Sequence, residues 1–409
     1  HPSVIIWGLG NENDWPGDYP EFDKQRIRTF MIELNDLAHS LDDERKTGIR
    51  RCDFCKDIVD VYSPSIWAGW YRGKFVEYEK VSYKNMQQVD HFFHMEWGGS
   101  SHAGRHDENP DQGLENIQSG QGADERAGDA SLVGGTARVS RDGNWSETYI
   151  CNLFDWHLRA QTEMPWLTGA AQWAFKDFST PVRPENPVPY MNQKGVIQRD
   201  FTKKESYYVF QSYWTEKPMV HIYGHSWETR WGEEGKKRMV KIYSNCEEVE
   251  LFLNDESVGI KKRNINTFPA CGLFWTIPFP KGRNELLAIG KKDRQEVRDT
   301  IRFNYQTKKW EQPDHFVMSE KIINEQYSWL EVKLLDINGT LCLDAKNKVE
   351  FSIIGDAELV KDQGTPHGAQ KVELANGVAK IKVKRYGASY SMAVKSDGLP
   401  TAILSRLKK

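Results

Sequence analysis

Two glutamates in this chain each stand at the end of a short apolar run. Glu12 closes Val4-Ile5-Ile6-Trp7-Gly8-Leu9-Gly10-Asn11-Glu12, and Glu96 closes His91-Phe92-Phe93-His94-Met95-Glu96 and is followed by Trp97-Gly98-Gly99. Such runs predict buried strands that present their last residues at the carboxyl end, where barrel enzymes keep their chemistry. One carboxyl can then protonate a leaving oxygen while the other attacks an anomeric carbon. The pattern therefore predicts cleavage of a glycosidic bond with retention of configuration.

Alternating strand and helix patterns surround both glutamates. We expect strands at Val4–Gly10, Lys46–Arg50, Ile58–Ser63, His91–Trp97 and Gly169–Phe175, and helices at Glu21–Leu41, Glu147–Gln161 and Lys203–Tyr213. This order is typical of βα units and a parallel sheet. Five units cannot close an eight-stranded barrel, and an open remnant leaves an apolar edge. We therefore expect a missing N-terminal half, on the same or a separate chain, to supply the first three strands.

The run from His1-Pro2-Ser3 to Gly10-Asn11-Glu12 resembles the fourth barrel strand of glycoside hydrolase family 2, the family of β-galactosidases, β-glucuronidases and β-mannosidases. The resemblance implies a (β/α)8 TIM barrel of which this chain holds strands four to eight. It also implies that Glu12 is the acid/base, that Asn11 binds the sugar 2-hydroxyl, and that Glu96, at the end of strand seven, is the nucleophile.

Aromatic residues near two other strand ends are candidates for substrate contact. The segment from Asp60 to Tyr71 is similar to the family's sixth strand and its loop, and Gln172–Phe178 is similar to the eighth. The family tyrosine that bonds the nucleophile aligns with Trp67, so either Tyr71 substitutes for it or that support is lost. Trp173 is the best candidate for a ring beneath the sugar. Trp67 and Trp70 are either core residues or sugar contacts.

Polar residues that follow the nucleophile leave two roles open. The stretch from Gly98 to Asn144 has no periodicity, which predicts a long loop beside the active site. Its His102, Arg105 and His106 either contact substrate or are solvated.

Two segments favour different sugars. Asn192-Gln193-Lys194 resembles the carboxylate-recognising pair of family 2 β-glucuronidases, and an amide and a lysine would suit a uronate. In the alternative, Lys194 simply precedes the last helix. The segment Met95–His102 with Arg105-His106 resembles β-galactosidases of bacteria that digest red-algal galactans. We expect an exo-acting β-galactosidase acting on plant or algal oligosaccharides, with a β-glucuronidase as the alternative and a non-catalytic carbohydrate-binding or scaffold fragment as the other class.

The second half of the chain changes to a period-two pattern bounded by turns. Strands are expected at Val220–Tyr223, Met239–Tyr243, Val249–Leu253, Ser257–Ile260, Leu273–Ile277, Leu286–Ile289 and Thr300–Phe303, with Asn254-Asp255 as a hairpin turn. A second set follows at Trp329–Leu335, Val349–Ile353, Val378–Val383 and Tyr390–Val394. We therefore divide the chain into a barrel part at 1–214 and two immunoglobulin-like β-sandwiches at 215–307 and 308–409.

Composition excludes several partners. Lys+Arg (55) nearly balances Asp+Glu (58), and no basic stripe indicates nucleic acid. No apolar run is long enough for a membrane span. The chain opens directly on a strand pattern, without a targeting segment. Six scattered cysteines predict no disulfide framework, and Cys52-x-x-Cys55 lacks the second pair of a zinc site, so no metal ligands are assigned. The sequence requires no cofactor, and it leaves a bound cation, self-association and the compartment open.

Overall fold

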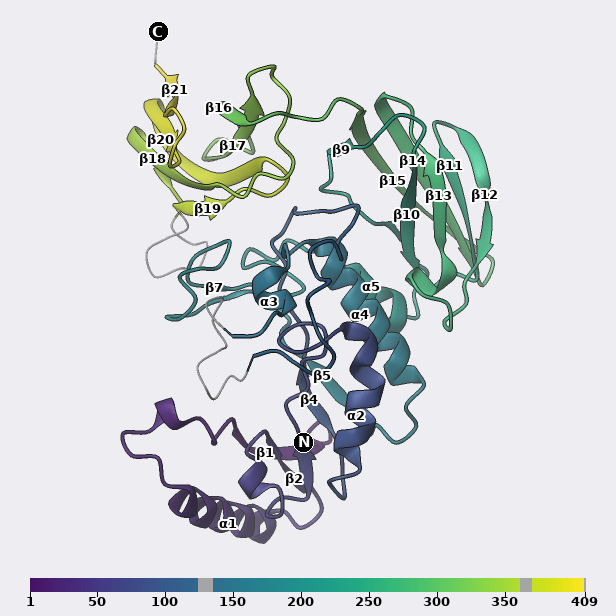
Figure 1. Cartoon of the computed structure of the whole chain (residues 1–409), viewed down its shortest axis with the longest axis vertical. Helices are drawn as coiled ribbons and strands as arrows, with labels where there is room; N and C mark the ends of the chain where they lie inside the picture. The colour runs from purple at the N-terminus through teal and green to yellow at the C-terminus, as the bar shows by residue number, and fades with distance from the viewer. Residues whose placement is uncertain (124–134, 361–369, 408–409) are drawn as a thin grey trace. The chain divides into compact units, whose positions relative to one another are not determined.

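The computed structural model describes residues 1–123, 135–360 and 370–407, which divide into two compact units. The first unit contains His1–Gly99, Asp111–Asn144 and Trp156–Ala174, and the second contains Ser100–Pro110, Trp145–Asp155 and Phe175–Lys409. The division does not follow chain order, because segments 100–110 and 145–155 belong with the C-terminal part. Figure 1 gives the course of the chain and the labels of its elements.

Five short parallel strands form the first unit's framework. Strands β1 (Ile6–Asn11), β2 (Lys46–Arg50) and β3 (Val61–Ser63) pair in chain order. Strands β4 (His94–Trp97) and β5 (Ala170–Gln172) also pair in parallel, and Tyr62 of β3 makes a parallel bridge to Phe92, just before β4. The five expected strands are confirmed, the second with the predicted bounds, the first shifted to end one residue later and the other three shorter than predicted, and their carboxyl ends face the same way.

Helix α1 (Lys24–Leu41) begins at a well-formed cap. Asp23 Oδ1 accepts the backbone N–H groups of Gln25 and Arg26 at 2.8 and 3.1 Å, which satisfies donors that the first helical turn leaves open. The helix buries Ile27 and Met31 against the core beside β2. The outer face of α1 exposes apolar side chains such as Phe30 and Leu37.

The other helices are mostly as expected. Helices α4 (Glu147–Thr162) and α5 (Glu205–Trp214) match the prediction, whereas α2 (Tyr78–Met86) and the short α3 (Val139–Asp142) were not predicted. Single 3-10 turns occur at η1 (Pro16–Asp18), η2 (Asp53–Cys55), η3 (Phe75–Glu77) and η5 (Ala270–Gly272). Within the described ranges, no helix combines the length and apolar composition needed to cross a bilayer.

A two-sheet sandwich occupies the middle of the second unit. One sheet has the order β13-β10-β8 and the other β12-β11-β14-β15-β9. Their bounds are β8 (Val220–Ile222), β9 (Thr229–Trp231), β10 (Lys237–Ser244), β11 (Glu248–Leu253), β12 (Glu256–Lys262), β13 (Phe274–Pro278), β14 (Gly282–Lys292) and β15 (Gln295–Gln306). Both sheets contribute to one apolar core, for example Ile242 of β10 and Leu251 of β11.

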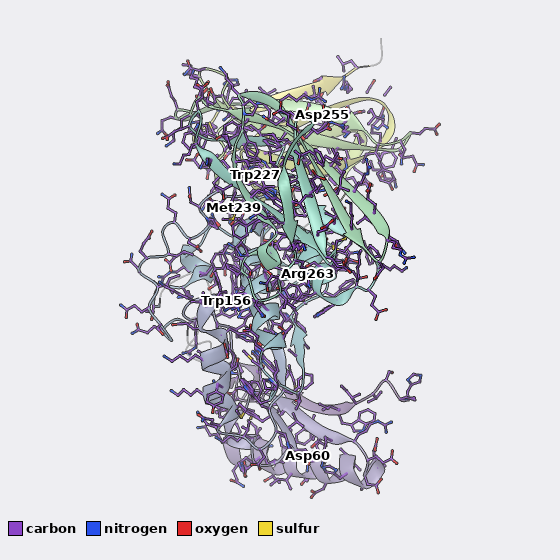
Figure 2. The ribbon with its side chains drawn as sticks, turned by 90° about the vertical axis from the view of Figure 1, so that its right-hand side faces the viewer. Asp60, Trp156, Trp227, Met239, Asp255 and Arg263 are labelled. Atoms are coloured by element: carbon purple, nitrogen blue, oxygen red, sulfur yellow. The ribbon has the colours of Figure 1, made fainter. Side chains whose placement is uncertain are left out.

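The hairpin turn between β11 and β12 is confirmed. Asn254 and Asp255 both have positive φ, 49° and 70°, as a two-residue hairpin turn of this hand requires. Figure 2 shows Asp255 at this end of the sheet and Arg263, which follows β12, at the other.

The C-terminal module differs from the expected pair of sheets. It has one six-stranded sheet in which β16-β17-β20-β18-β19 lie in order and β21 also pairs with β20. The bounds are β16 (Pro313–Ile322), β17 (Tyr327–Asp336), β18 (Lys348–Leu359), β19 (Lys371–Glu373), β20 (Val378–Lys395) and β21 (Ala402–Arg406). The first part of β20 pairs with β17 and the last part with β21, so one long strand carries the sheet across the whole module.

A buried lysine joins three segments of the second unit near the short pair β6 (Phe178–Ser179) and β7 (Met191–Asn192). Lys204 Nζ, whose side chain is fully buried, bonds to Asp177 Oδ1 at 2.9 Å. It also donates to the carbonyl oxygens of Gln193 at 3.0 Å and Ser101 at 3.2 Å. The three ammonium hydrogens therefore have three acceptors.

Candidate active site

Glu12 and Arg51 lie in strained backbone at neighbouring strand ends. Glu12 follows β1, has φ 57°, and donates its N–H to the carbonyl of Arg50 at 3.0 Å. Arg51 follows β2, also has φ 57°, and donates its N–H to the Ser63 carbonyl at 2.8 Å. Non-glycine residues in this region each cost about 1 to 3 kcal/mol and cluster at functional sites. The surrounding sheet therefore imposes a conformation that these side chains would not choose alone.

Glu96 stands on β4, which is fixed by hydrogen bonds on both sides of it. Met95 N–H donates to Ser63 Oγ at 2.8 Å. His94 is buried, with its Nε2 3.2 Å from the Ile66 carbonyl and its Nδ1 2.7 Å from the Tyr78 hydroxyl. Because a carbonyl only accepts, Nε2 carries the proton and Nδ1 accepts from tyrosine. Burial lowers the pKa of His94 to about 3, so it is a neutral support.

Arg50, the last residue of β2, joins the two glutamates. Its Nη1 bonds to Glu12 Oε1, and its Nη2 lies 3.0 Å from Glu96 Oε1. The arginine side chain is 3% exposed, whereas Glu12 and Glu96 are 28% and 15% exposed. Arg51 adds a second contact to Glu12 at 3.2 Å and pairs with Asp14 at 3.2 Å. One buried guanidinium thus gathers two partly accessible carboxyls at the carboxyl edge of the sheet.

Sequence reasoning missed Arg50 and Arg51. The available signal was a pair of adjacent arginines ending a short strand pattern, where surface lysines or arginines are also common. Nothing in the spacing distinguishes a guanidinium that turns inward from one in solvent.

The predicted aromatic contacts are of two kinds. Trp67, Trp70 and Tyr71 lie in the turn after β3 and are all buried, with Trp67 and Tyr71 packed edge to face at 5.1 Å between ring centroids. Burial favours the core alternative for these rings, and their contact with a sugar stays a prediction. Trp173, after β5, is 43% exposed and donates its backbone N–H to the Trp97 carbonyl at 2.9 Å. Asn11 at the end of β1 is exposed as well, and contact of either residue with a sugar stays a prediction.

His102, Arg105 and His106 lie in the second unit and have protein partners there. His102 Nε2 lies 2.8 Å from the Glu373 carbonyl, and Arg105 Nη2 pairs with the Glu373 carboxylate at 2.8 Å. The backbone N–H of His106 donates to Asn376 Oδ1 at 2.5 Å, and its ring bonds to two hydroxyls. Burial lowers the pKa of both histidines to about 3. All three side chains are buried rather than solvated, and a contact with substrate stays a prediction.

Asn192 and Lys194 also belong to the second unit. Asn192 ends β7, and its Oδ1 accepts the backbone N–H of Lys194 at 3.2 Å. This bond joins the Asn192 amide to the backbone of Lys194, which is buried. Their relation to the glutamates stays a prediction.

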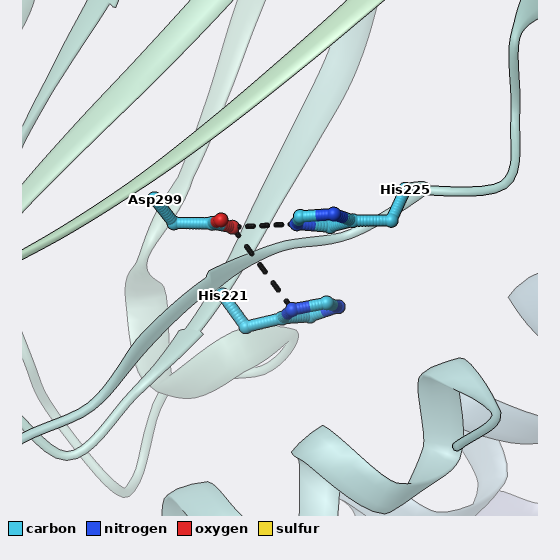
Figure 3. Close-up of side chains that lie close together, drawn as sticks. All are labelled: His221, His225 and Asp299. Atoms are coloured by element: carbon cyan, nitrogen blue, oxygen red, sulfur yellow. Dashed lines mark hydrogen bonds and ion pairs between the residues drawn. The ribbon is translucent and has the colours of Figure 1, made fainter. Parts of the chain in front are cut away.

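One group of possible metal ligands occurs in the described part of the chain, namely His221, His225 and Asp299 (Figure 3). Asp299 Oδ2 lies 2.8 Å from His225 Nε2 and 4.0 Å from His221 Nδ1. The two imidazoles stack with 11° between their planes and 4.6 Å between centroids. A bound ion must lie on the in-plane lone pair of each ring, and two stacked parallel rings do not share such a point. The group is therefore better arranged to link β8, β15 and α5, since Glu205 also bonds to His221 at 2.8 Å.

Comparison with known proteins gives close relatives. A family described as a domain of unknown function (DUF4982) matches residues 235–298. A protein of Formosa agariphila, provisionally named a β-glucuronidase, is 46% identical over 390 residues, which cover 95% of this chain and 47% of that protein.

Two solved structures agree with this relationship. The β-glucuronidase of Parabacteroides merdae is 57% identical, with a TM-score of 0.96 over 100% of this chain and 51% of its own. β-Glucuronidase 3 of Bacteroides uniformis is 49% identical, with a TM-score of 0.90 over 99% of this chain and 50% of its own. The chain thus spans about half the length of each relative.

Proposed function

The chain belongs to glycoside hydrolase family 2, and from this premise we propose that the protein containing it is a retaining, exo-acting β-glucuronidase. The observation that carries the proposal is the joining of Glu12 and Glu96 by one buried guanidinium at the carboxyl ends of parallel strands. Two gathered carboxyls at this place supply the pair that glycoside cleavage with retention needs.

In the proposed mechanism, Glu96 attacks the anomeric carbon of a terminal β-linked sugar. Glu12 gives its proton to the departing oxygen, and a covalent glycosyl-enzyme forms. Glu12 then takes a proton from water, which displaces Glu96 and releases the sugar with its configuration retained. The open face of Trp173 supports a sugar ring in this scheme, and Asn11 bonds to its 2-hydroxyl.

We further propose that the five parallel strands are strands four to eight of a (β/α)8 barrel. Support comes from β1, which is an edge strand in the described part of the chain and carries the exposed apolar residue Trp7, next to the exposed Ile5. An edge of this kind is usually covered by further structure. A segment that supplies three more strands would cover it, and the two-sheet sandwich from β8 to β15 would serve as an immunoglobulin-like support.

The proposed substrate is a β-glucuronide and not the β-galactoside that the sequence after Glu96 favoured. Three close relatives carry β-glucuronidase names, and the histidines and arginine that suggested a galactoside are occupied by protein contacts. Asn192 and Lys194 then become the proposed clamp for the sugar carboxylate, with the amide donating and the ammonium supplying charge.

The test uses the full-length protein that contains this chain and a panel of p-nitrophenyl β-glucuronide, β-galactoside and β-mannoside. We expect turnover of the glucuronide, its loss in Glu96→Ala, and rescue of Glu12→Ala by azide. Glu33→Ala, on the exposed face of α1, is the matched control and should keep full activity. Turnover that survives in Glu96→Ala would refute the assignment. A galactoside preference would refute the specificity, and sugar binding without any turnover would support the non-catalytic alternative.

The carboxylate clamp has its own test. Lys194→Met should raise KM for the glucuronide by about 10-fold or more, because it removes one charged hydrogen bond of roughly 1.5 to 3 kcal/mol. An unchanged KM would exclude Lys194 from the clamp.

A further inference from the structure

We infer that Arg50 is a positioning residue of the proposed reaction, setting the spacing of Glu12 and Glu96 and offsetting the repulsion between them. This inference rests on the proposed function, and its role goes beyond the acid/base and nucleophile pair. The residue touches the reacting carboxyls rather than the sugar, so it acts through them.

The geometry of Arg50 suits this role. A guanidinium is a rigid planar fork that can hold two oxygens at fixed directions, which a lysine point charge cannot do. Here the two terminal nitrogens bond to different carboxylates, and Nη2 also donates to Ser65 Oγ at 3.1 Å. The backbone is fixed as well, because Arg50 is the last residue of β2 and its carbonyl accepts the Glu12 N–H. Movement of Arg50 would therefore displace both glutamates together.

Charge gives a second reason for the arrangement. Two carboxylates that share a site repel each other, and one of them is then easily protonated. A guanidinium between them offsets that repulsion. The charged and titratable groups that face Arg50 come from three elements and the turns after them, namely Glu12 and Asp14 after β1, Arg51 after β2, and His94 and Glu96 on β4. Arg51 contacts Glu12 and Asp14, whereas Arg50 contacts both glutamates.

The same contact assigns Arg50 a task in the second half of the reaction. Once Glu96 has formed its ester with the sugar, it carries no charge. Of the two glutamates, only Glu12 can then be a charged partner of Arg50. Nη1 of Arg50 then holds Glu12 Oε1 while Nη2 no longer faces a charged partner in Glu96. Glu12 must be ionised at this stage to accept a proton from the attacking water. Arg50 therefore keeps Glu12 in position for this step.

The experiment compares wild type, Arg50→Lys and Arg50→Met in the full-length protein on p-nitrophenyl β-glucuronide. Arg50→Met should lose about 100-fold or more in kcat, as expected when reacting groups are misplaced by about 1 Å. Its pH–activity profile should move to higher pH by about one unit or more, because nearby carboxyls are protonated more easily once a cation is lost. Arg50→Lys keeps the charge, so its profile should stay in place while kcat falls. Arg28→Met removes a surface arginine paired with Asp57 and should change neither quantity.

A second measurement needs no substrate. The unfolding temperature of Arg50→Met should lie furthest below that of wild type near pH 7, and the gap should narrow toward pH 4, where carboxyls become neutral. If wild type hydrolyses no glycoside, the proposed function fails, while this gap still tests the pairing. The role of Arg50 is overturned if wild type is active, the pH–activity profile of Arg50→Met matches that of wild type, and the difference in unfolding temperature between the two does not change with pH. Should Arg50→Met not fold, an unchanged kcat in Arg50→Lys would overturn that role as well.

Discussion

Replacing Lys204 by methionine tests how much the buried ion pair of Lys204 and Asp177 contributes to the stability of the second unit. Methionine nearly preserves the volume of the lysine stem but removes the ammonium. The change removes a donor that now lies 2.9 to 3.2 Å from Asp177 Oδ1 and from the carbonyls of Ser101 and Gln193, and Asp177 Oδ1 keeps only the backbone N–H of Gly195 among its described donors. Removing one partner of a buried ion pair costs roughly 3 to 5 kcal/mol, because the other charge stays buried alone. We therefore expect the free energy of unfolding to fall by about 4 kcal/mol.

The assay is thermal and urea unfolding at pH 7, followed by tryptophan fluorescence. A loss of about 4 kcal/mol should lower the unfolding temperature by about 8 to 16 °C for a body of this size. The cost should shrink at pH 5, because Asp177 can take a proton. Burial already raises the pKa of this carboxyl to about 6 despite the nearby ammonium of Lys204. Lys236→Met, at an exposed position, is the matched control and should change stability by less than about 0.5 kcal/mol.

The double variant Lys204→Met/Asp177→Asn separates the cost of an unpaired buried charge from the cost of the other contacts that Lys204 makes. Removing both charges should restore part of the loss, since no unpaired charge then remains buried. A single variant that loses less than about 1 kcal/mol at pH 7 would refute the reasoning, because it would mean that water or movement supplies the missing donor.

Three further outcomes follow from described contacts. Burial raises the pKa of Asp177 from 3.8 to about 6. The free energy of unfolding should therefore be higher below pH 4, where Asp177 is protonated in both states, and should fall by on the order of 3 kcal/mol as pH rises to about 6, at 1.36 kcal/mol per pKa unit. Asp177→Asn should flatten this part of the curve of unfolding free energy against pH. Asp23→Ala should cost about 1 kcal/mol by removing the cap of α1, measured by urea unfolding, and Asp23→Ser should recover most of it. Leu334→Ala, in the buried core of the C-terminal sheet, should cost about 2 to 5 kcal/mol, whereas Leu37→Ala on the exposed face of α1 should cost less than about 0.5 kcal/mol, and equal costs would contradict the burial assignment.

Strands with a clear period were predictable from sequence. The Lys46–Arg50 strand has the predicted bounds, and the hairpin at Asn254-Asp255 follows from residues that tolerate positive φ. Helix α2 was missed because Tyr78–Met86 is short and begins without a side-chain cap. The two strands expected at Val378–Val383 and Tyr390–Val394 are one strand, β20. Arg385-Tyr386-Gly387 between them resembles a turn, and the ladder with β18 has a register shift there, between the pairs Gly355–Tyr390 and Ala357–Arg385, but the strand continues through it.

The site was predictable only where a residue ends a strand. Glu12 and Glu96 could be found because strand patterns mark their positions. The role of Arg50 could not be predicted, because it depends on contacts with two carboxyls that lie 38 and 46 positions away along the chain. The partners of His102 and Arg105 could not be found for a related reason, because Glu373 lies far along the chain in a sheet that no local pattern connects to them.

The contact between segment 102–106 and segment 373–376 has a consequence during synthesis. His106 and Asn376 are 270 positions apart and exchange hydrogen bonds in both directions. At translation rates of about 5 to 20 residues per second, the ribosome needs at least about 13 s after making His106 before Asn376 exists. For that interval His102 and Arg105 lack Glu373 and the backbone N–H of His106 lacks Asn376, so a nascent chain must keep these groups hydrated or shielded. A protein truncated before Glu373 would remain in that state permanently.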